Sequence, residues 1–568
     1  MLHLRPICGW PLKRESSLTG PSRFSIGRAS RRSFVQGLAL ASLATPAWRA
    51  SAQEQSLALT VDEIPVNLTG KARRATVVNG SLPGPVLRLR EGEDAVIAVT
   101  NRLNEPTSIH WHGLRLPADQ DGVPGLSFRG IATGETFTYR FPVRQAGTYW
   151  YHSHSGMQEQ TGLIGALILE PRDGERIAAD REHVIVLSDW TDADPMSIVA
   201  NLKQQSDYYD YGRRTLGDLA RAAKGHGLKP ALSETAMWAG MRMSPTDIQD
   251  VSGTTYTYLA NGVPPAGNWT GLFQPGERVR LRLINGAAMT TFDLRIPGLM
   301  LMVTAADGSD VEPVEVEELR IGVAETYDLI IQPKEDRAYT LFAQAQDRSG
   351  YARATLAPRP GMAGEIPPMD PRPERSMADM GMGGMAMGGM NMAGMKMAPP
   401  EGARPAGVNV DTVAMAPRSR LNEAGDGLDG DDRRALTYAD LQAAKAAPDL
   451  VPTRTLPFHL TGNMERWTWG FDGRKFSEAR PIRIALGETV RLVLINDTMM
   501  EHPIHLHGFL FQLENGQDGR RPLKHTLNVK PGERASVVFT ADTPGHWAFH
   551  CHLMYHMETG MFRTVVVA

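Results

Sequence analysis

Cysteine is nearly absent from this sequence, with two residues in a chain of 568. Two cysteines exclude a scaffold stapled by several disulfides. No apolar run reaches the roughly 18 residues that would indicate a membrane-spanning helix. Basic and acidic residues nearly balance, at 60 and 63, so the overall charge gives no reason to expect nucleic acid as a partner. We therefore expect a globular protein without stable membrane insertion, long enough for about three to four domains.

The first 52 residues have the pattern of an export signal. A basic stretch containing Arg31-Arg32 precedes an apolar run from Val35 to Ala44, and Ala50-Ser51-Ala52 supplies a small-residue cleavage motif. The arginine pair resembles a twin-arginine signal. We therefore expect residues 1–52 to be a signal peptide, the twin-arginine machinery to be a partner, and the periplasm to be the destination.

An internal repeat organises the rest of the chain. Gly-Glu pairs at 92–93, 276–277 and 487–488 each precede an alternating apolar run that ends at Asn101, Asn285 or Asn496. Such alternation after a turn is typical of β-strands. Three copies of a strand-rich unit predict an all-β protein of three β-sandwich domains, which we place at 53–172, 173–356 and 436–568. Residues 357–435 are rich in Pro, Gly and Met and are expected to be a linker or insert, followed by a short helix near 435–447.

Ten of the 16 histidines fall into four clusters in the first and third repeats. Side chains two apart on a strand share a face, and neighbouring side chains point to opposite faces. The pattern therefore predicts two centres. The first collects eight histidines: His110, His112, His152, His154, His505, His507, His550 and His552. The second collects His502, Cys551, His556 and Met561.

Two histidines, one thiolate and a weak axial thioether form the donor set of blue-copper electron-transfer sites. Zinc is the alternative metal, but a structural zinc site needs four ligands in a closed tetrahedron, and eight histidines do not make such a unit. In addition, Cys551 is the direct sequence neighbour of both His550 and His552, so an electron leaving a metal at Cys551 has only one residue of backbone to cross. Of the six histidines outside the clusters, four are expected in the core or at the surface: His183, His226, His459 and His525.

The four motifs, in this order and spacing, resemble the multicopper oxidases, and the resemblance covers nearly the whole chain after residue 52. It implies cupredoxin-like Greek-key domains and four copper ions. It also implies one-electron oxidation of a donor and reduction of O2 to water. By this resemblance the type 1 copper ligands are His502, Cys551, His556 and Met561, and the type 2 ligands are His110 and His505. The type 3 ligands are His112, His152, His154, His507, His550 and His552.

The reduction of O2 consumes protons, so acids are expected near the copper cluster. Asp121 matches a position where the family often has such an acid. A second family acid often directly follows the last type 1 histidine, where this chain has Met557, and Glu558 is a weak substitute one residue further on.

The segment before the third repeat indicates which members of the family this chain resembles most. It carries methionines on a five-residue period at positions Met380, Met382, Met385, Met387, Met390, Met392, Met395 and Met397. With the twin-arginine-like signal, this repeat is similar to the bacterial periplasmic copper-resistance oxidases of the family. Since thioethers bind Cu(I), these methionines are candidates for Cu(I) capture, although a flexible low-complexity linker would also fit. The expected donor is Cu(I). The alternatives are a laccase-like oxidase of phenols or aromatic amines and a copper-sequestering protein.

Overall fold

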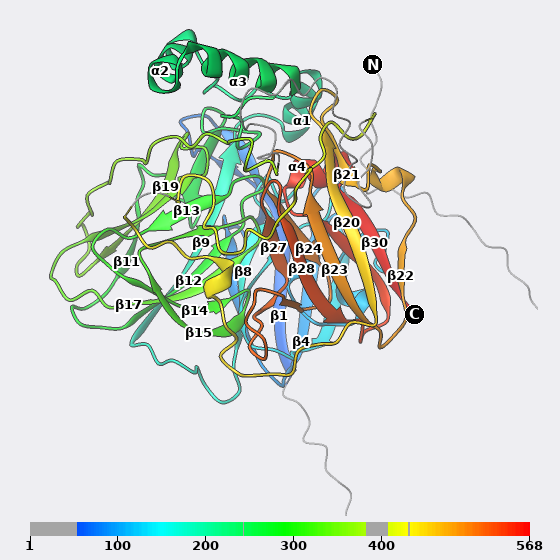
Figure 1. The fold of residues 1–568 in the computed structure, drawn as a ribbon. Helices are drawn as coiled ribbons and strands as arrows, with labels where there is room; N and C mark the ends of the chain where they lie inside the picture. The colour runs from blue at the N-terminus through cyan, green and yellow to red at the C-terminus, as the bar shows by residue number, and fades with distance from the viewer. Residues whose placement is uncertain (1–53, 242, 382–406, 430–431) are drawn as a thin grey trace, which may run out of the picture.

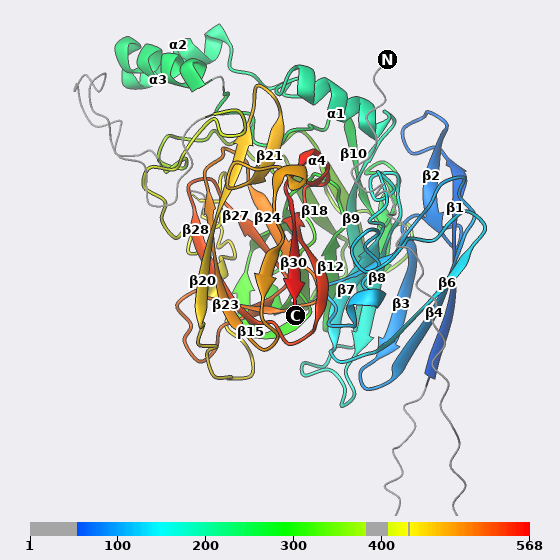
Figure 2. The ribbon, with the colours of Figure 1, turned by 90° about the vertical axis from the view of Figure 1, so that its right-hand side faces the viewer.

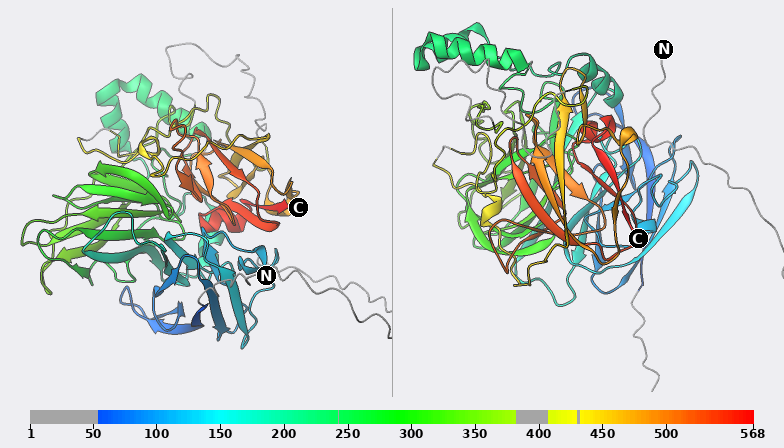
Figure 3. Two further views of the ribbon diagram at one scale, coloured as in Figure 1. Left: turned by 90° about the horizontal axis from the view of Figure 1, so that it is seen from below. Right: turned by 45° about the vertical axis from the view of Figure 1, so that its right-hand side comes forward.

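The computed structural model describes residues 54–241, 243–381, 407–429 and 432–568. Its strands fall into three groups along the chain, and each group forms two sheets (Figure 1). We name the groups domain 1 (54–170), domain 2 (181–357) and domain 3 (454–567) after their first and last strands. Seen from below, the domains surround a common centre, so each domain contacts the other two (Figure 3, left).

The strands of domain 1 are β1 (Glu54–Val66), β2 (Arg73–Val78), β3 (Gly84–Arg90), β4 (Asp94–Asn101), β5 (His110–His112), β6 (Thr136–Pro142), β7 (Gly147–His152) and β8 (Ile164–Glu170). Those of domain 2 are β9 (Arg181–Thr191), β10 (Tyr256–Ala260), β11 (Trp269–Leu272), β12 (Val279–Asn285), β13 (Phe292–Arg295), β14 (Leu301–Ala306), β15 (Ser309–Val316), β16 (Glu318–Ile321), β17 (Thr326–Ile331), β18 (Tyr339–Ala345) and β19 (Tyr351–Ala357). Those of domain 3 are β20 (Arg454–Asn463), β21 (Thr468–Phe471), β22 (Ile482–Ile484), β23 (Thr489–Asn496), β24 (His502–Leu506), β25 (Phe511–Leu513), β26 (Leu523–Lys524), β27 (Thr526–Val529), β28 (Arg534–Thr540), β29 (Gly545–Cys551) and β30 (Phe562–Val567).

All three domains share one pairing scheme. The first strand of each domain runs parallel to the strand that follows the repeated Gly-Glu pair, as β1 with β4, β9 with β12 and β20 with β23. That second strand then pairs antiparallel with β6, β17 or β28. The sheets of each domain are therefore mixed, and the sequence repeat corresponds to a repeat of topology.

The repeated asparagines have the same structural role in each domain. The side-chain amides of Asn101, Asn285 and Asn496 each donate to two backbone carbonyls across the turn that follows the strand. Each side-chain oxygen accepts from the backbone amide two residues further on. All three are completely buried, and a buried amide with all these partners holds its turn in one conformation. In domains 1 and 3 that turn leads directly into a histidine-bearing strand.

Domain 2 contains helices that the strand periodicity did not predict. They are α1 (Pro195–Gln204), α2 (Leu216–His226) and α3 (Leu228–Met241), and they lie on one end of the molecule (Figures 1 and 2). The Asp194 side chain caps α1, and Thr215 with Asp218 forms a capping box on α2. A fourth helix, α4 (Met554–Thr559), lies in domain 3 beneath α1.

The segment between domains 2 and 3 is ordered over much of its length. It adds isolated bridges to domain 2 at Val311–Ala443 and Glu318–Ala435. The helix expected near 435–447 is a single 3-10 turn, Tyr438–Asp440, because the residues on either side of that turn make these bridges instead. Met380 is 2% exposed. The other seven methionines of the periodic repeat lie outside the described residues.

Candidate metal centre

The strands of domains 1 and 3 direct the eight clustered histidines into one buried region. His110 and His112 lie on β5, opposite β7, whose last residue is His152. In domain 3, His505 on β24 is the direct cross-strand partner of His550 on β29. Directly opposed residues on antiparallel strands project from the same face, so the register of each domain brings its histidines together.

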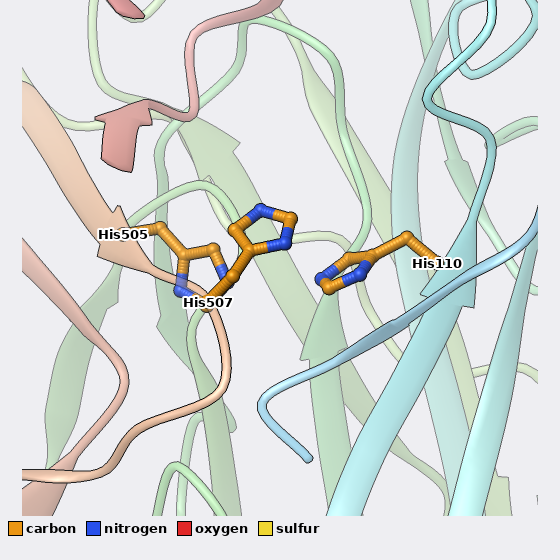
Figure 4. A group of neighbouring side chains, drawn as sticks. All are labelled: His110, His505 and His507. Atoms are coloured by element: carbon orange, nitrogen blue, oxygen red, sulfur yellow. The ribbon is translucent and has the colours of Figure 1, made fainter. Parts of the chain in front are cut away.

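The two domains interleave these rings. The ring of His110 stacks on that of His507 with centroids 3.9 Å apart, and His112 stacks on His505 at 3.8 Å. Figure 4 shows His110 approaching from the domain 1 side, opposite His505 and His507 from domain 3. Each stacked pair has one member from each domain, so the site exists only when the domains are docked. We call these eight residues the eight-histidine cluster.

Most members of the cluster direct one ring nitrogen outward to a fixed partner. The Nδ1–H of His110 donates to the backbone carbonyl of Asp121 at 2.8 Å, and that of His507 donates to Asp121 Oδ2, also at 2.8 Å. The Nδ1–H of His152 lies 2.7 Å from Glu159 Oε2. Such hydrogen bonds fix the tautomer and the orientation of metal-binding imidazoles.

The other ring nitrogens face inward, and among the described residues they have no partner outside the cluster. The Nε2 atoms of His507 and His550 face each other at 3.0 Å. Six further histidines each have an open nitrogen: His110 Nε2, His112 Nδ1, His152 Nε2, His154 Nε2, His505 Nε2 and His552 Nε2, and His552 Nδ1, 4.0 Å from Glu159, has no hydrogen-bond partner either. Eight buried nitrogens pointing into one volume are costly as unpaired polar groups and fit the donor set of several transition-metal ions.

Burial and the neighbouring imidazoles keep most of these rings neutral. Burial is the larger cause and mutual repulsion the smaller in lowering the pKa of His112, His152, His154, His505, His507 and His552. The pKa of His550 is lowered to about 4, mainly by burial. Because a neutral imidazole keeps a lone pair for a metal, the cluster is ready for metal binding at neutral pH.

The second centre, which we call the cysteine site, lies on the other face of the same strands. Cys551 is the cross-strand partner of Ile504, two residues after His502, so Cys551 and His502 share a face. Its Sγ lies 3.5 Å from His502 Nδ1 and 3.9 Å from His556 Nδ1, and the two nitrogens are 3.3 Å apart. These three donors are completely buried.

The surroundings of the cysteine site hold its ligands in place. Thr498 Oγ1 lies 2.7 Å from His502 Nε2, and Asp250 Oδ2 accepts from His556 Nε2–H at 2.9 Å. The Met561 backbone is bonded to both Cys551 and His556, and its side chain is completely buried. Burial raises the pKa of the Cys551 thiol, so a metal ion must displace the thiol proton in order to bind there.

The structure brings some predicted residues together and separates others. Asp121 contacts one histidine from each of the two domains. Glu558 is half-buried on α4, where its charge acts on Lys203 of α1. Met499 and Met500, which precede His502, are buried in the core.

The sequence prediction missed four residues at the two centres: Glu159, Asp250, Asp307 and His525. Glu159 is buried beside His152, and Asp250 reaches the cysteine site from domain 2. His525 lies 3.2 Å from His112, 413 residues away in sequence. Glu159 lies only seven residues after His152, and this closeness in sequence was a weak indication of its role. Nothing in the local sequence indicates Asp250, Asp307 or His525.

The fold and both centres define a copper protein, and comparison with known proteins identifies the class. Multicopper oxidase family models match residues 60–174, 181–360 and 449–568. The chain belongs to the multicopper oxidase family, and is therefore a copper-dependent oxidoreductase that uses O2 as electron acceptor.

Individual relatives define the subgroup of the family more closely than the family models do. A copper resistance protein A homolog from Pseudomonas syringae pathovar tomato is 50% identical over 585 aligned positions, which cover 95% of this chain and 99% of that protein. Copper resistance protein A from Escherichia coli is 49% identical with the same coverage. The multicopper oxidase MmcO of Mycobacterium tuberculosis is 31% identical over 96% of this chain and 97% of its own length. The resemblance to copper-resistance oxidases is therefore confirmed.

Solved structures support the fold. Fet3p, a multicopper oxidase that functions in iron import, superposes with a TM-score of 0.66 at 20% identity, covering 91% of this chain and 90% of its own. The laccase from Botrytis aclada gives 0.64 at 22% identity, with 91% and 88% covered. The all-β, cupredoxin-like fold class predicted from the sequence is thus confirmed.

Proposed function

We propose that this chain oxidises Cu(I) to Cu(II) in the periplasm and so contributes to copper resistance. Four Cu(I) ions each give up one electron, and one O2 takes up these four electrons and four protons to form two waters. Copper supplies the redox chemistry when bound at the two centres. The chain supplies the ligands, the connection between the centres, the protons and the exclusion of water.

The proposed ligand sets account for four copper ions. One ion occupies the cysteine site as type 1 copper, held by His502, Cys551, His556 and Met561. Three ions occupy the eight-histidine cluster. His110 and His505 hold the type 2 ion, and His112, His152, His154, His507, His550 and His552 hold the type 3 pair.

The observation that carries this proposal is the covalent link between the centres. Cys551 belongs to the cysteine site, and the residues on either side of it, His550 and His552, belong to the eight-histidine cluster. Around the end of β29, the rings of His550 and His552 lie with their centroids 5.4 Å apart, while the thiol between them contacts His502 and His556. A storage protein has no need for this arrangement, whereas an oxidase that separates donor oxidation from O2 reduction requires an electron path.

Two buried carboxylates are placed to handle protons. We propose Asp121 as a proton donor, since its carboxylate receives a hydrogen bond from His507. Glu159 contacts His152 at 2.7 Å and lies 4.0 Å from His552. Glu558 is a weaker candidate because its charge faces Lys203.

Cu(I) as donor is supported by charge at the cysteine site. Asp250 contacts His556, and the carboxyl groups of Asp210 and Asp207 lie close enough to act with Asp250 on the buried Asp247. A group of carboxylates favours a cation over a neutral phenol. As a weak thioether donor, Met561 would give a copper ion at the cysteine site a modest potential, suited to an easily oxidised donor. The relatives named for copper resistance fit a copper ion as the donor.

We further propose export through the twin-arginine pathway, based on the sequence of residues 1–52, and Cu(I) capture by the periodic methionines. Among the described residues, no helix combines the length and apolar composition needed to cross a bilayer.

Oxygen uptake by the copper-loaded protein tests this function, with Cu(I) and then a simple phenol as the only donor. We expect faster uptake with Cu(I). Faster uptake with the phenol would instead indicate a laccase. A protein that holds four coppers and consumes no O2 with either donor would indicate sequestration.

A further inference from the structure

His525 lies against the eight-histidine cluster although it belongs to no histidine motif. It occupies the position between β26 and β27 and is completely buried. Its Nδ1 lies 3.2 Å from Nε2 of His112, and its backbone carbonyl accepts from the Nδ1–H of His505 at 2.7 Å. This one residue therefore contacts a cluster histidine from domain 1 and another from domain 3.

His112 is oriented differently from its neighbours. The inward, unpartnered nitrogen is Nδ1, whereas in His110, His152 and His505 it is Nε2. A metal on Nδ1 requires the ring proton on Nε2. That Nε2–H points at His525 Nδ1 and at Thr526 Oγ1, which is 3.3 Å away. The hydrogen-bond partner of the outer nitrogen sets which nitrogen of an imidazole can bind a metal.

Domain 2, which contributes no cluster histidine, anchors this arrangement. Asp307 Oδ2 accepts from the backbone amides of His525 at 3.2 Å and Thr526 at 3.1 Å, and it pairs with Lys524 Nζ at 3.0 Å. Asp307 occupies the turn between β14 and β15 with a φ of 47°. All these groups are buried, so the 524–526 segment is fixed against domain 2.

The edge of the His525 ring that carries Cδ2 and Nε2 packs closely against Gly113. A Cβ on Gly113, the residue after His112, would lie 2.4 Å from His525 Cδ2 and 2.8 Å from its Nε2. The Nε2 of His525 is therefore packed against the Gly113 backbone, while its Nδ1 faces the outer nitrogen of His112. The buried Nε2 of His525 has no hydrogen-bond partner among the described residues, and His525 contacts the cluster through its Nδ1 and its backbone carbonyl.

We propose that His525 is a positioning residue for the copper cluster, and that Asp307 of the middle domain acts through it. The His525 imidazole selects the tautomer and ring orientation of His112, and its carbonyl selects those of His505. The inference rests on the proposed copper assignment of the eight histidines. It gives the metal-free middle domain a specific part in assembling a site formed by the other two.

Two substitutions of His525 separate a positioning role from a packing role. His525→Asn keeps an acceptor near the position of Nδ1, and His525→Leu fills similar space without one. Removing an outer partner of a metal ligand costs about 10–100-fold in metal affinity, so we expect that loss in His525→Leu and near-parent behaviour in His525→Asn. The matched control is His183→Leu, which removes a half-buried histidine of domain 2 that is bonded to the Leu272 carbonyl.

The readouts are copper per chain, copper affinity and the magnetic coupling of the copper pair, none of which requires turnover. The blue absorption of the cysteine site reports correct folding of domain 3 in the same sample. We expect Asp307→Ala to weaken copper binding and coupling as His525→Leu does, with the blue absorption kept. This variant also tests the inference if His525→Leu fails to fold.

Three outcomes would overturn the inference. Parent-like copper binding and coupling in both His525→Leu and Asp307→Ala would show that neither residue positions the ligands. Loss of a whole copper ion from both His525→Asn and His525→Leu would show that His525 is itself a ligand. A parent protein that binds copper only at the cysteine site would overturn the proposed function as well, and only this outcome would do so.

Discussion

Asp121 joins the two halves of the eight-histidine cluster, and two substitutions distinguish its structural part from its chemical part. Its carbonyl and carboxylate each hold one histidine at 2.8 Å, from domain 1 and domain 3 respectively. In Asp121→Ala the His507 N–H loses a charged partner, which is worth about 1.5–3 kcal/mol. That loss corresponds to roughly 10- to 150-fold weaker copper binding.

Asp121→Asn keeps an oxygen that can accept from His507 but removes the acid. Since general acid catalysis contributes about 10²–10⁴-fold, we expect O2 reduction to slow at least about 100-fold with copper content unchanged. Copper analysis and anaerobic stopped-flow reduction of the cysteine site by Cu(I) provide the controls, and both should match the parent. Parent-like O2 reduction in Asp121→Asn would refute the proton role. Equal copper loss in the Asn and Ala variants would leave only a structural role.

Three further perturbations have defined outcomes. Deleting 382–397, which spares the buried Met380, should slow oxygen uptake with Cu(I) and leave uptake with a phenol nearly unchanged; equal slowing of both would argue against Cu(I) capture. In Gly122→Ala the new Cβ would lie 1.9 Å from the carbonyl oxygen of Ile109, the residue before His110. We therefore expect less copper at the eight-histidine cluster and an unchanged blue absorption from the cysteine site. Normal copper content would contradict this packing argument. In the metal-free protein, burial lowers the pKa of His550 to about 4, so the unfolded chain binds more protons below pH ~6.5. Stability should therefore be full above that pH and fall on acidification, by about 3 kcal/mol for this residue, and urea unfolding at several pH values measures it; a flat profile would contradict the shift.

Strand periodicity predicts which side chains at the two centres lie on the same face, and their roles as copper ligands stay a prediction. Because side chains alternate along a strand, His550 and His552 had to share one face, and Cys551 had to take the other. The repeated asparagines were equally informative, since each ends a strand with the same set of hydrogen bonds. Both the strand alternation and the asparagine turns depend on residues close together in sequence, so the sequence pattern is sufficient to predict them.

The residues that sequence analysis missed depend on how the domains dock. His525 and Asp250 belong to ordinary loop sequences, and only tertiary structure brings them to histidines in other domains. The helix expected near 435–447 is wrong for a similar reason, since residues 435 and 443 bridge to domain 2 strands. The Pro- and Gly-rich composition of the segment between domains 2 and 3 also gave no indication of its buried contacts. In that segment Arg375 is buried and forms an ion pair with Asp426 at 2.9 Å.

The most direct test of the account is the ratio of Cu(I) oxidised to O2 consumed by the copper-loaded protein, measured beside Cys551→Ser. The account predicts four Cu(I) per O2, no hydrogen peroxide, and no oxygen uptake in the variant, whose cysteine site lacks its thiolate. A ratio of two with peroxide released, or uptake that survives in Cys551→Ser, would contradict electron transfer from the cysteine site to the eight-histidine cluster.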